Sequence, residues 1–182
     1  MVDVGPNGNI VSSLKARARI LHRKLKELDP EAQARLRRLP DLRKLDGEAL
    51  AQAVQRRHCL KVIARGHGFN GWSHAVEVLT KDASAGFGKL LCPERCEILT
   101  NVWCRSHEEA LEAQAQYGGV IFPYMHQFLI ASPAYMGELG LDPADIDLAA
   151  VGPDWSEPLD RAARRRVCEK IVVANMAWED GD

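Results

Sequence analysis

The chain has 182 residues and lacks several features that would assign it to a class at once. It has no apolar run of about 18 residues, because its most apolar stretch, Val120 to Ala131, is interrupted by Pro123, His126 and Gln127. Its first residues do not combine a basic segment with an apolar one, so we expect no secretory signal. Its five cysteines are an odd number and do not suggest a disulfide framework. We therefore expect a cytoplasmic protein with reduced thiols and no membrane partner.

Motifs for nucleotide binding and catalysis are also missing. Gly66, Gly68 and Gly71 have the spacing of a dinucleotide fingerprint, but they follow a predicted helix, whereas that motif follows a strand. A thiol with a histidine base, for instance Cys104 with His126, could serve as a nucleophile, but no known nucleophile motif surrounds these two residues. The sequence therefore leaves open whether the protein is an enzyme, and it predicts no cofactor apart from the zinc considered below.

The near-neutral net charge of −1 hides an uneven distribution. Residues 1–85 contain 16 Lys and Arg against nine Asp and Glu, whereas residues 86–182 contain eight against 16. Hydrophobic residues make up 46% and charged residues 27%, which is typical of globular domains. We predict two domains, a basic helical module over 1–85 and an acidic α+β domain over 86–182, joined by the small residues of Lys81 to Gly88.

Residues 1–85 have the apolar periodicity of amphipathic helices. A first helix is predicted over Ile10 to Leu28, with Ser12 or Ser13 as its cap. Asp29 and Pro30 predict the start of a second helix, which should run to about Leu39. Two further helical pieces should follow Asp46, and a last short helix should begin after Asn70-Gly71. The apolar stripe of the first helix comprises Ile10, Leu14, Ala18, Leu21, Leu25 and Leu28.

Basic side chains follow these helices and could contact an anionic partner. They are Lys15, Arg19 and Lys26 on the first helix and Arg56, Arg57, Lys61 and Arg65 further along. The segment Arg56 to Leu79 has the outline of a helix-turn-helix. However, its second helix offers only Ser73, His74 and Glu77 for reading bases, so we favour a helical hairpin with a solvated basic face.

The same segment resembles a small helical module found at the N-terminus of some bacterial ankyrin-repeat and glyoxalase-related proteins. The resemblance depends on Ile63-Ala64-Arg65, Gly68-Phe69 and Trp72. The whole chain resembles small uncharacterised bacterial proteins in which this module precedes a second domain. The matching motifs of that domain are Asn101-Val102-Trp103, Gly118-Gly119 and Pro123 to Phe128. The resemblance implies the two-domain organisation and assigns no activity.

Residues 86–182 predict the α+β half. A strand is expected over Glu97 to Arg105, then a helix capped by Ser106 and ended by Gly118-Gly119. One strand is expected over Val120 to Ser132, and a final helix over Asp160 to about Ala174. The predicted fold class is α+β, with the helical module followed by a small α/β sandwich whose sheet is mixed or antiparallel.

Two candidate sites lie in this half. If a ligand pocket exists, we expect polar and aromatic side chains of the strands and a nearby loop to line it. These are Asn101, Trp103, Tyr124, His126, Gln127, Asp154 and Trp155. The second candidate is Cys92-x3-Cys96-x7-Cys104-x2-His107, because three thiolates and an imidazole can hold tetrahedral zinc. The alternative is that these cysteines are small buried hydrophobic residues.

Three functions remain open at this stage. The first is a non-enzymatic binding or regulatory protein whose basic half contacts nucleic acid or an acidic protein surface, including a second copy of the chain in a homo-oligomer. The second is an enzyme or small-molecule binder that uses a pocket in the α+β domain. The third is a zinc-stabilised interaction module.

Overall fold

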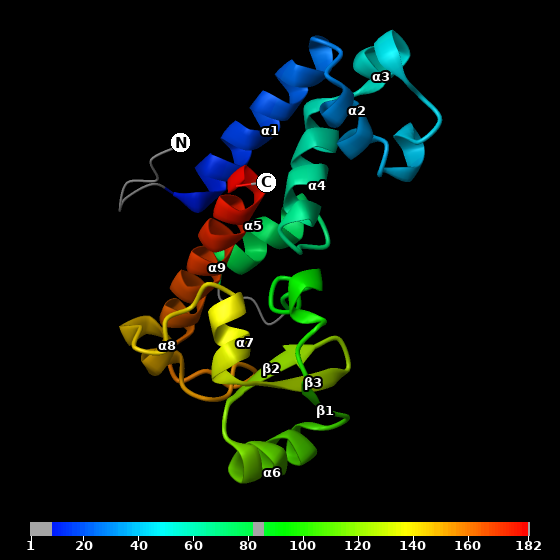
Figure 1. Ribbon diagram of the computed structural model, residues 1–182. Coiled ribbons are helices and arrows are strands. Elements are labelled where there is room, and N and C mark those ends of the chain that lie inside the picture. Colours follow the sequence, from blue (N-terminus) through cyan, green and yellow to red (C-terminus); the bar gives the residue numbers. More distant parts are fainter. Residues whose placement is uncertain (1–8, 82–85, 182) are drawn as a thin grey trace. The chain divides into compact units, whose positions relative to one another are not determined.

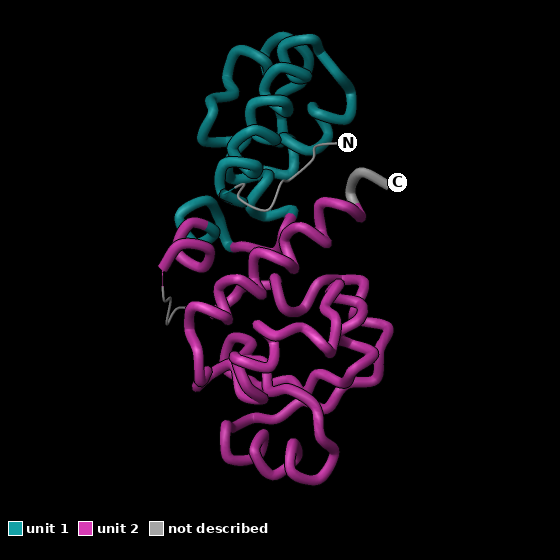
Figure 2. Tube along the Cα trace, turned by 90° about the vertical axis from the view of Figure 1, so that its left-hand side faces the viewer, with its two compact units in different colours: residues 1–66, 70–75 teal, residues 67–69, 76–182 magenta. Residues whose placement is uncertain are grey.

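The computed structural model describes residues 9–81 and 86–181, and the side chains as far as residue 178. The chain divides into two compact units (Figure 2). Unit 1 comprises residues 1–66 and 70–75, and unit 2 comprises residues 67–69 and 76–182. The predicted linker, Lys81 to Gly88, lies after residue 76 and therefore belongs to unit 2. Its residues 82–85 lie outside the described part of the chain.

Unit 1 is helical. Its elements are α1 (Ile10–Lys26), α2 (Pro30–Leu36), the 3-10 helix η1 (Pro40–Leu42), α3 (Gly47–Ala53), α4 (Arg56–Gly66) and the start of α5 (Trp72–Thr80). Helices α1 and α4 pack side by side and run in opposite directions (Figure 1). The predicted apolar stripe of α1 is buried over its whole length inside the helix. Leu28 is different: it follows the helix, has a φ of 58° and is 40% exposed.

Local hydrogen bonds explain where these helices begin. Asn9 caps α1, because its side chain accepts a hydrogen bond from the amide of Val11, so the prediction of a serine cap was wrong. Asp29 caps α2 as predicted, through the amide of Ala32. Helix α2 ends at Leu36, earlier than expected.

Unit 2 combines helices with a small sheet. Besides the end of α5, its elements are η2 (Glu94–Cys96), β1 (Val102–Cys104), α6 (His107–Tyr117), β2 (Val120–Tyr124), β3 (Gln127–Ala131), α7 (Pro133–Glu138), α8 (Ile146–Val151) and α9 (Arg161–Gly181). The strand order is β1-β3-β2, and both pairs are antiparallel. The α+β prediction and its antiparallel alternative are confirmed.

The long strand predicted over Val120 to Ser132 is in fact a hairpin. Tyr124 pairs with Gln127, and Met125 and His126 form the turn between β2 and β3. Met125 has a φ of 53°, a conformation that glycine or asparagine usually supplies. Because neither residue type is present, the sequence contained no signal for this turn.

Helices cover both faces of the sheet (Figure 1). On one face, Ala110 of α6 packs with Cys104, Ile121 and Ile130. On the other face, Phe122 makes edge contacts with Tyr135 of α7 and with Trp155, which is fully buried. The sheet therefore forms the middle layer of unit 2.

The outer edge of β2 is occupied by the loop that precedes α9. The amide of Ile121 donates to the carbonyl of Pro153, and the amide of Trp155 donates to the carbonyl of Ile121. These two hydrogen bonds hold Asp154 beside the sheet. Among the helices that the structure describes, none is long and apolar enough to span a membrane.

Candidate functional site

The four predicted zinc ligands are not brought together. Cys104 is buried under α6 in the sheet, and His107 places its Nε2 atom 2.6 Å from Oδ2 of Asp154. Cys92 instead lies 3.4 Å from the hydroxyl of Tyr135. Within residues 9–81 and 86–181, no three His, Cys, Asp or Glu side chains are arranged to hold a metal ion. The zinc hypothesis therefore fails on geometry. The spacing of these residues along the sequence does not show that Cys104 is buried in a sheet while Cys92 contacts Tyr135.

Burial makes the two thiols near Tyr135 poor metal ligands and weak nucleophiles. Burial raises the pKa of Cys92, and it also raises the pKa of Cys96. Tyr135 donates a hydrogen bond to the carbonyl of Leu91, and burial raises the pKa of its hydroxyl well above the usual range. This cluster is structural, and it links α7 to the segment before η2.

The predicted pocket residues do not all surround one cavity. Trp103 and Tyr124 share a face of the sheet and meet edge to face, with ring centres 5.6 Å apart. Asn101 donates to the carbonyl of Leu99, while His126 and Gln127 are exposed at the hairpin. The remaining two predicted pocket residues are Asp154, on the α6 side of the sheet, and Trp155, in the core.

The carboxylate of Asp154 makes polar contacts with Ser156 and His107. Its Oδ1 accepts hydrogen bonds from the amide and the hydroxyl of Ser156, and its Oδ2 faces His107. Burial favours the neutral acid, but these hydrogen bonds outweigh burial and lower the pKa of Asp154. The ring of His107 packs on Phe128, with ring centres 5.4 Å apart. The pair connects α6 to the loop at the edge of β2.

The predicted basic residues lie on α1 and α4 of unit 1. Six of the seven, Lys15, Arg19, Lys26, Arg56, Arg57 and Arg65, are exposed, and Lys61 is half-buried. Two of them also make contacts within unit 1. Lys26 donates to the carbonyl of Ala51 over 2.6 Å, and Arg65 donates to the carbonyl of Asn70. Among the described residues, Lys15, Arg19, Arg56, Arg57 and Lys61 form no ion pair.

The helix-turn-helix outline is present, but few side chains of its second helix, α5, are exposed where they could contact bases. In α5 only Ser73 and Thr80 are exposed, and the other residues are buried or half-buried. The Nδ1 atom of His74 accepts a hydrogen bond from the amide of Asn70. A recognition helix must present several side chains to the major groove, so these observations favour the helical hairpin.

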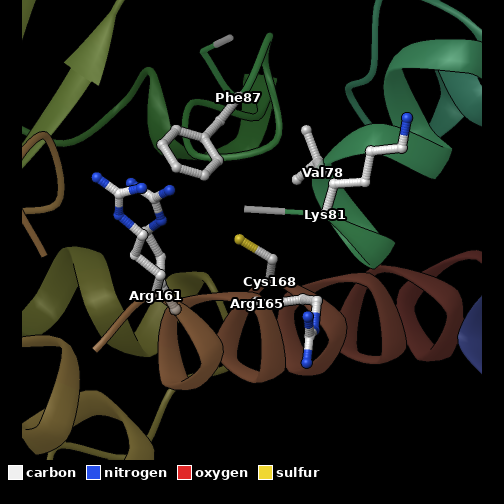
Figure 3. Close-up of a pocket in the computed structure, with 7 residues that line it drawn as sticks. Val78, Lys81, Phe87, Arg161, Arg165 and Cys168 are labelled. Carbon is white, nitrogen blue, oxygen red and sulfur yellow. The ribbon is translucent and has the colours of Figure 1, made fainter. Parts of the chain in front are cut away.

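Sequence reasoning missed a small cavity in unit 2. Its lining comes from the end of α5, from Phe87 and from the first turns of α9 (Figure 3). The lining residues are Val78, Lys81, Phe87, Arg161, Arg164, Arg165 and Cys168. Phe87 and Cys168 point toward the cavity from opposite sides. Cys168 is fully buried, and burial raises the pKa of its thiol to about 12. The thiol therefore lines the cavity in its protonated, unreactive form.

We compared the chain with family models, with curated proteins and with solved structures, and found no match in any of the three.

Proposed function

We propose that unit 1 binds the phosphate backbone of a nucleic acid through the basic side chains of α1 and α4. Divided at the unit boundary, the sequence contains 15 Lys and Arg against seven Asp and Glu in unit 1, a net charge of +8. Unit 2 contains nine against 18, a net charge of −9. The excess of positive charge in unit 1 is the observation that carries the proposal.

The spacing of these cations suits a row of phosphates. Lys15 and Arg19 are separated by one helical turn on α1, and so are Arg57, Lys61 and Arg65 in succession on α4. Of these five, only Arg65 forms a side-chain hydrogen bond within the described part of the chain, and that bond leaves part of its guanidinium available. Cations without intramolecular partners lose little when they bind an anion.

Nucleic acid is favoured over an acidic protein because unit 1 exposes little apolar surface. Interfaces between proteins are centred on buried aromatic and aliphatic anchors. Within the described part of unit 1, the only large apolar residues that are exposed are Ile20 and Leu28, at 41% and 40%. Contacts with phosphates need no such anchor. Because α5 is not displayed for reading bases, we expect binding without sequence preference.

Fluorescence anisotropy with labelled duplex DNA and duplex RNA tests this proposal in the full chain. If four phosphates are neutralised, raising salt from about 50 to 200 mM should weaken binding of B-DNA roughly a hundred-fold. The variant Arg56→Gln/Arg57→Gln should bind more weakly and show a smaller salt dependence. The control Arg43→Gln/Lys44→Gln removes the same charge from the exposed loop before α3 and should bind like the unchanged protein.

Several outcomes would count against the proposal. Absence of binding at the lower salt concentration would reject it. An equal loss in the control pair would show only a response to net charge. Binding of polyglutamate with the affinity found for nucleic acid would instead point to an acidic protein partner.

A further inference from the structure

The sheet of unit 2 has one protected edge and one free edge. Strand β2 lies at one edge, where Pro123 has no N–H and the loop through Asp154 binds the main chain of Ile121. Strand β1 lies at the other edge (Figure 1). Among the described residues, the main chain of β1 is paired with β3 alone. Its outward N–H and C=O groups are therefore available to a further strand.

The side chains of β1 suit this edge to pairing. Valine and tryptophan favour strands, and the three residues of β1 include no charge and no proline. Val102 is 39% exposed on the α6 face of the sheet, and Trp103 is 44% exposed on the opposite face. Proteins commonly protect a free edge with charged residues, proline or a covering loop. Within the part of the chain that the structure describes, β1 has none of these protections.

The charges around β1 determine what kind of strand would pair with it. Unit 2 has a net charge of −9. Helix α6, which follows β1 in the sequence, contains Glu108, Glu109 and Glu112 but no Lys or Arg. Glu109 lies at the end of β1, because its Oε2 accepts a hydrogen bond from the amide of Arg105 over 2.7 Å. A basic segment is therefore attracted to this edge, whereas an acidic segment or a nucleic acid is repelled.

A second copy of the chain fits this edge less well. Helix α6 packs against β1, so pairing of two β1 strands would bring two copies of α6 and their glutamates to one interface. Like charges placed together oppose association. A basic partner would instead find both an acidic surrounding and an aromatic surface, because Trp103 and Tyr124 meet edge to face with ring centres 5.6 Å apart.

We propose that β1 is the docking edge for an extended basic segment of a partner protein, which joins the sheet as a fourth strand. Main-chain hydrogen bonds to β1 supply the pairing. On one face, a Lys or Arg of the segment lies beside Trp103, whose ring attracts a cation. On the other face, an apolar residue of the segment covers Val102. This site lies in unit 2 and is independent of the nucleic-acid surface proposed for unit 1.

The probe is a capped heptapeptide of alternating Lys and Val, labelled with fluorescein. Its anisotropy is followed as the full chain is added in about 150 mM salt. We expect saturable binding of one peptide per chain, and slower hydrogen–deuterium exchange of the β1 amides in the complex. The same peptide with Glu in place of Lys should not bind. A peptide N-methylated at each interior main-chain nitrogen keeps its charge but cannot donate hydrogen bonds, and should bind at least ten-fold more weakly.

Two substitutions locate the peptide on the protein. Trp103→Lys places a like charge in the middle of the edge and removes the ring, and should weaken binding at least ten-fold. Tyr117→Lys makes the same change of charge at the end of α6 that leads to β2, where Tyr117 is 64% exposed, and should bind normally. Circular dichroism compares the folds. If Trp103→Lys does not fold, the hydrogen exchange of the unchanged protein decides the question.

Several outcomes would overturn the proposal. Absence of saturable binding at millimolar peptide would reject it. Equal binding of the N-methylated peptide, or an equal loss in Tyr117→Lys, would show only a general attraction of charge. Slower exchange away from β1 would place the peptide on another surface. A dimer that Trp103→Lys dissociates in sedimentation equilibrium would assign the edge to a second copy of the chain.

Discussion

Replacing Gly140 with alanine should destabilise unit 2 through two effects that can be separated. Gly140 follows α7 and has a φ of 76°, and a Cβ added there would overlap the Cβ of Ala174 in α9. The left-handed backbone costs a residue other than glycine about 1 kcal/mol. The overlap of two carbon atoms in a packed contact adds about 1 to 3 kcal/mol. We expect Gly140→Ala to lower the free energy of unfolding by about 2 to 4 kcal/mol.

A double-mutant cycle isolates the overlap. Ala174→Gly alone should cost about 1 kcal/mol, because glycine destabilises the interior of a helix. In Gly140→Ala/Ala174→Gly the second methyl group is gone, so only the backbone and helix costs remain, about 2 kcal/mol together. Urea unfolding followed by circular dichroism measures all four proteins, with the m-value checked for constancy. Strict additivity of the two single changes would refute the packing argument.

Three other changes test contacts within unit 2, each by urea unfolding. Tyr135→Phe removes a hydroxyl that donates to a buried main-chain carbonyl 2.8 Å away, and should cost about 1 to 3 kcal/mol; no measurable change would contradict that hydrogen bond. Lys170→Met breaks the pair with Asp145 at 2.6 Å, but Lys170 is 40% exposed, so a loss of only about 0.2 to 1 kcal/mol is expected, and less at high salt. Ser156→Ala removes a hydroxyl whose hydrogen bond helps to lower the pKa of Asp154. Above about pH 4 the unchanged protein should therefore be more stable than this variant. That advantage should shrink as the pH falls through the pKa of the folded state, and an advantage that grows on acidification would show the opposite sign of coupling.

Much of unit 1 was predictable because its signals are local. Asp29 followed by Pro30 specifies the start of α2 through a cap and a fixed φ, whatever surrounds them. The buried stripe of α1 follows directly from the helical period. Even here the exact start was missed, because Asn9 and the two serines after Ile10 are all good caps and only the backbone shows which one is used.

The sites of unit 2 depend on contacts between residues that are distant in the sequence. Lys81 and Phe87 line the same cavity as Arg161, although all three strands of the sheet lie between them in the sequence. No spacing rule connects such positions. Asp154 was expected to line a pocket, and it instead pairs with His107, because the loop containing Asp154 returns to the edge of β2. Periodicity describes one element at a time, so it could not show this return.

The strand order of the sheet has a consequence for how unit 2 is made. β3, the central strand, comes last of the three in the sequence, and β1 and β2 each pair with β3 and not with each other. During synthesis, β1, α6 and β2 therefore emerge before either strand has a partner in the sheet. Pairing begins only when the chain has been extended past the turn at Met125, and β1 then closes across a longer loop than β2 does. Until that moment α6 has no finished surface to cover, so the sheet and its helix must form together.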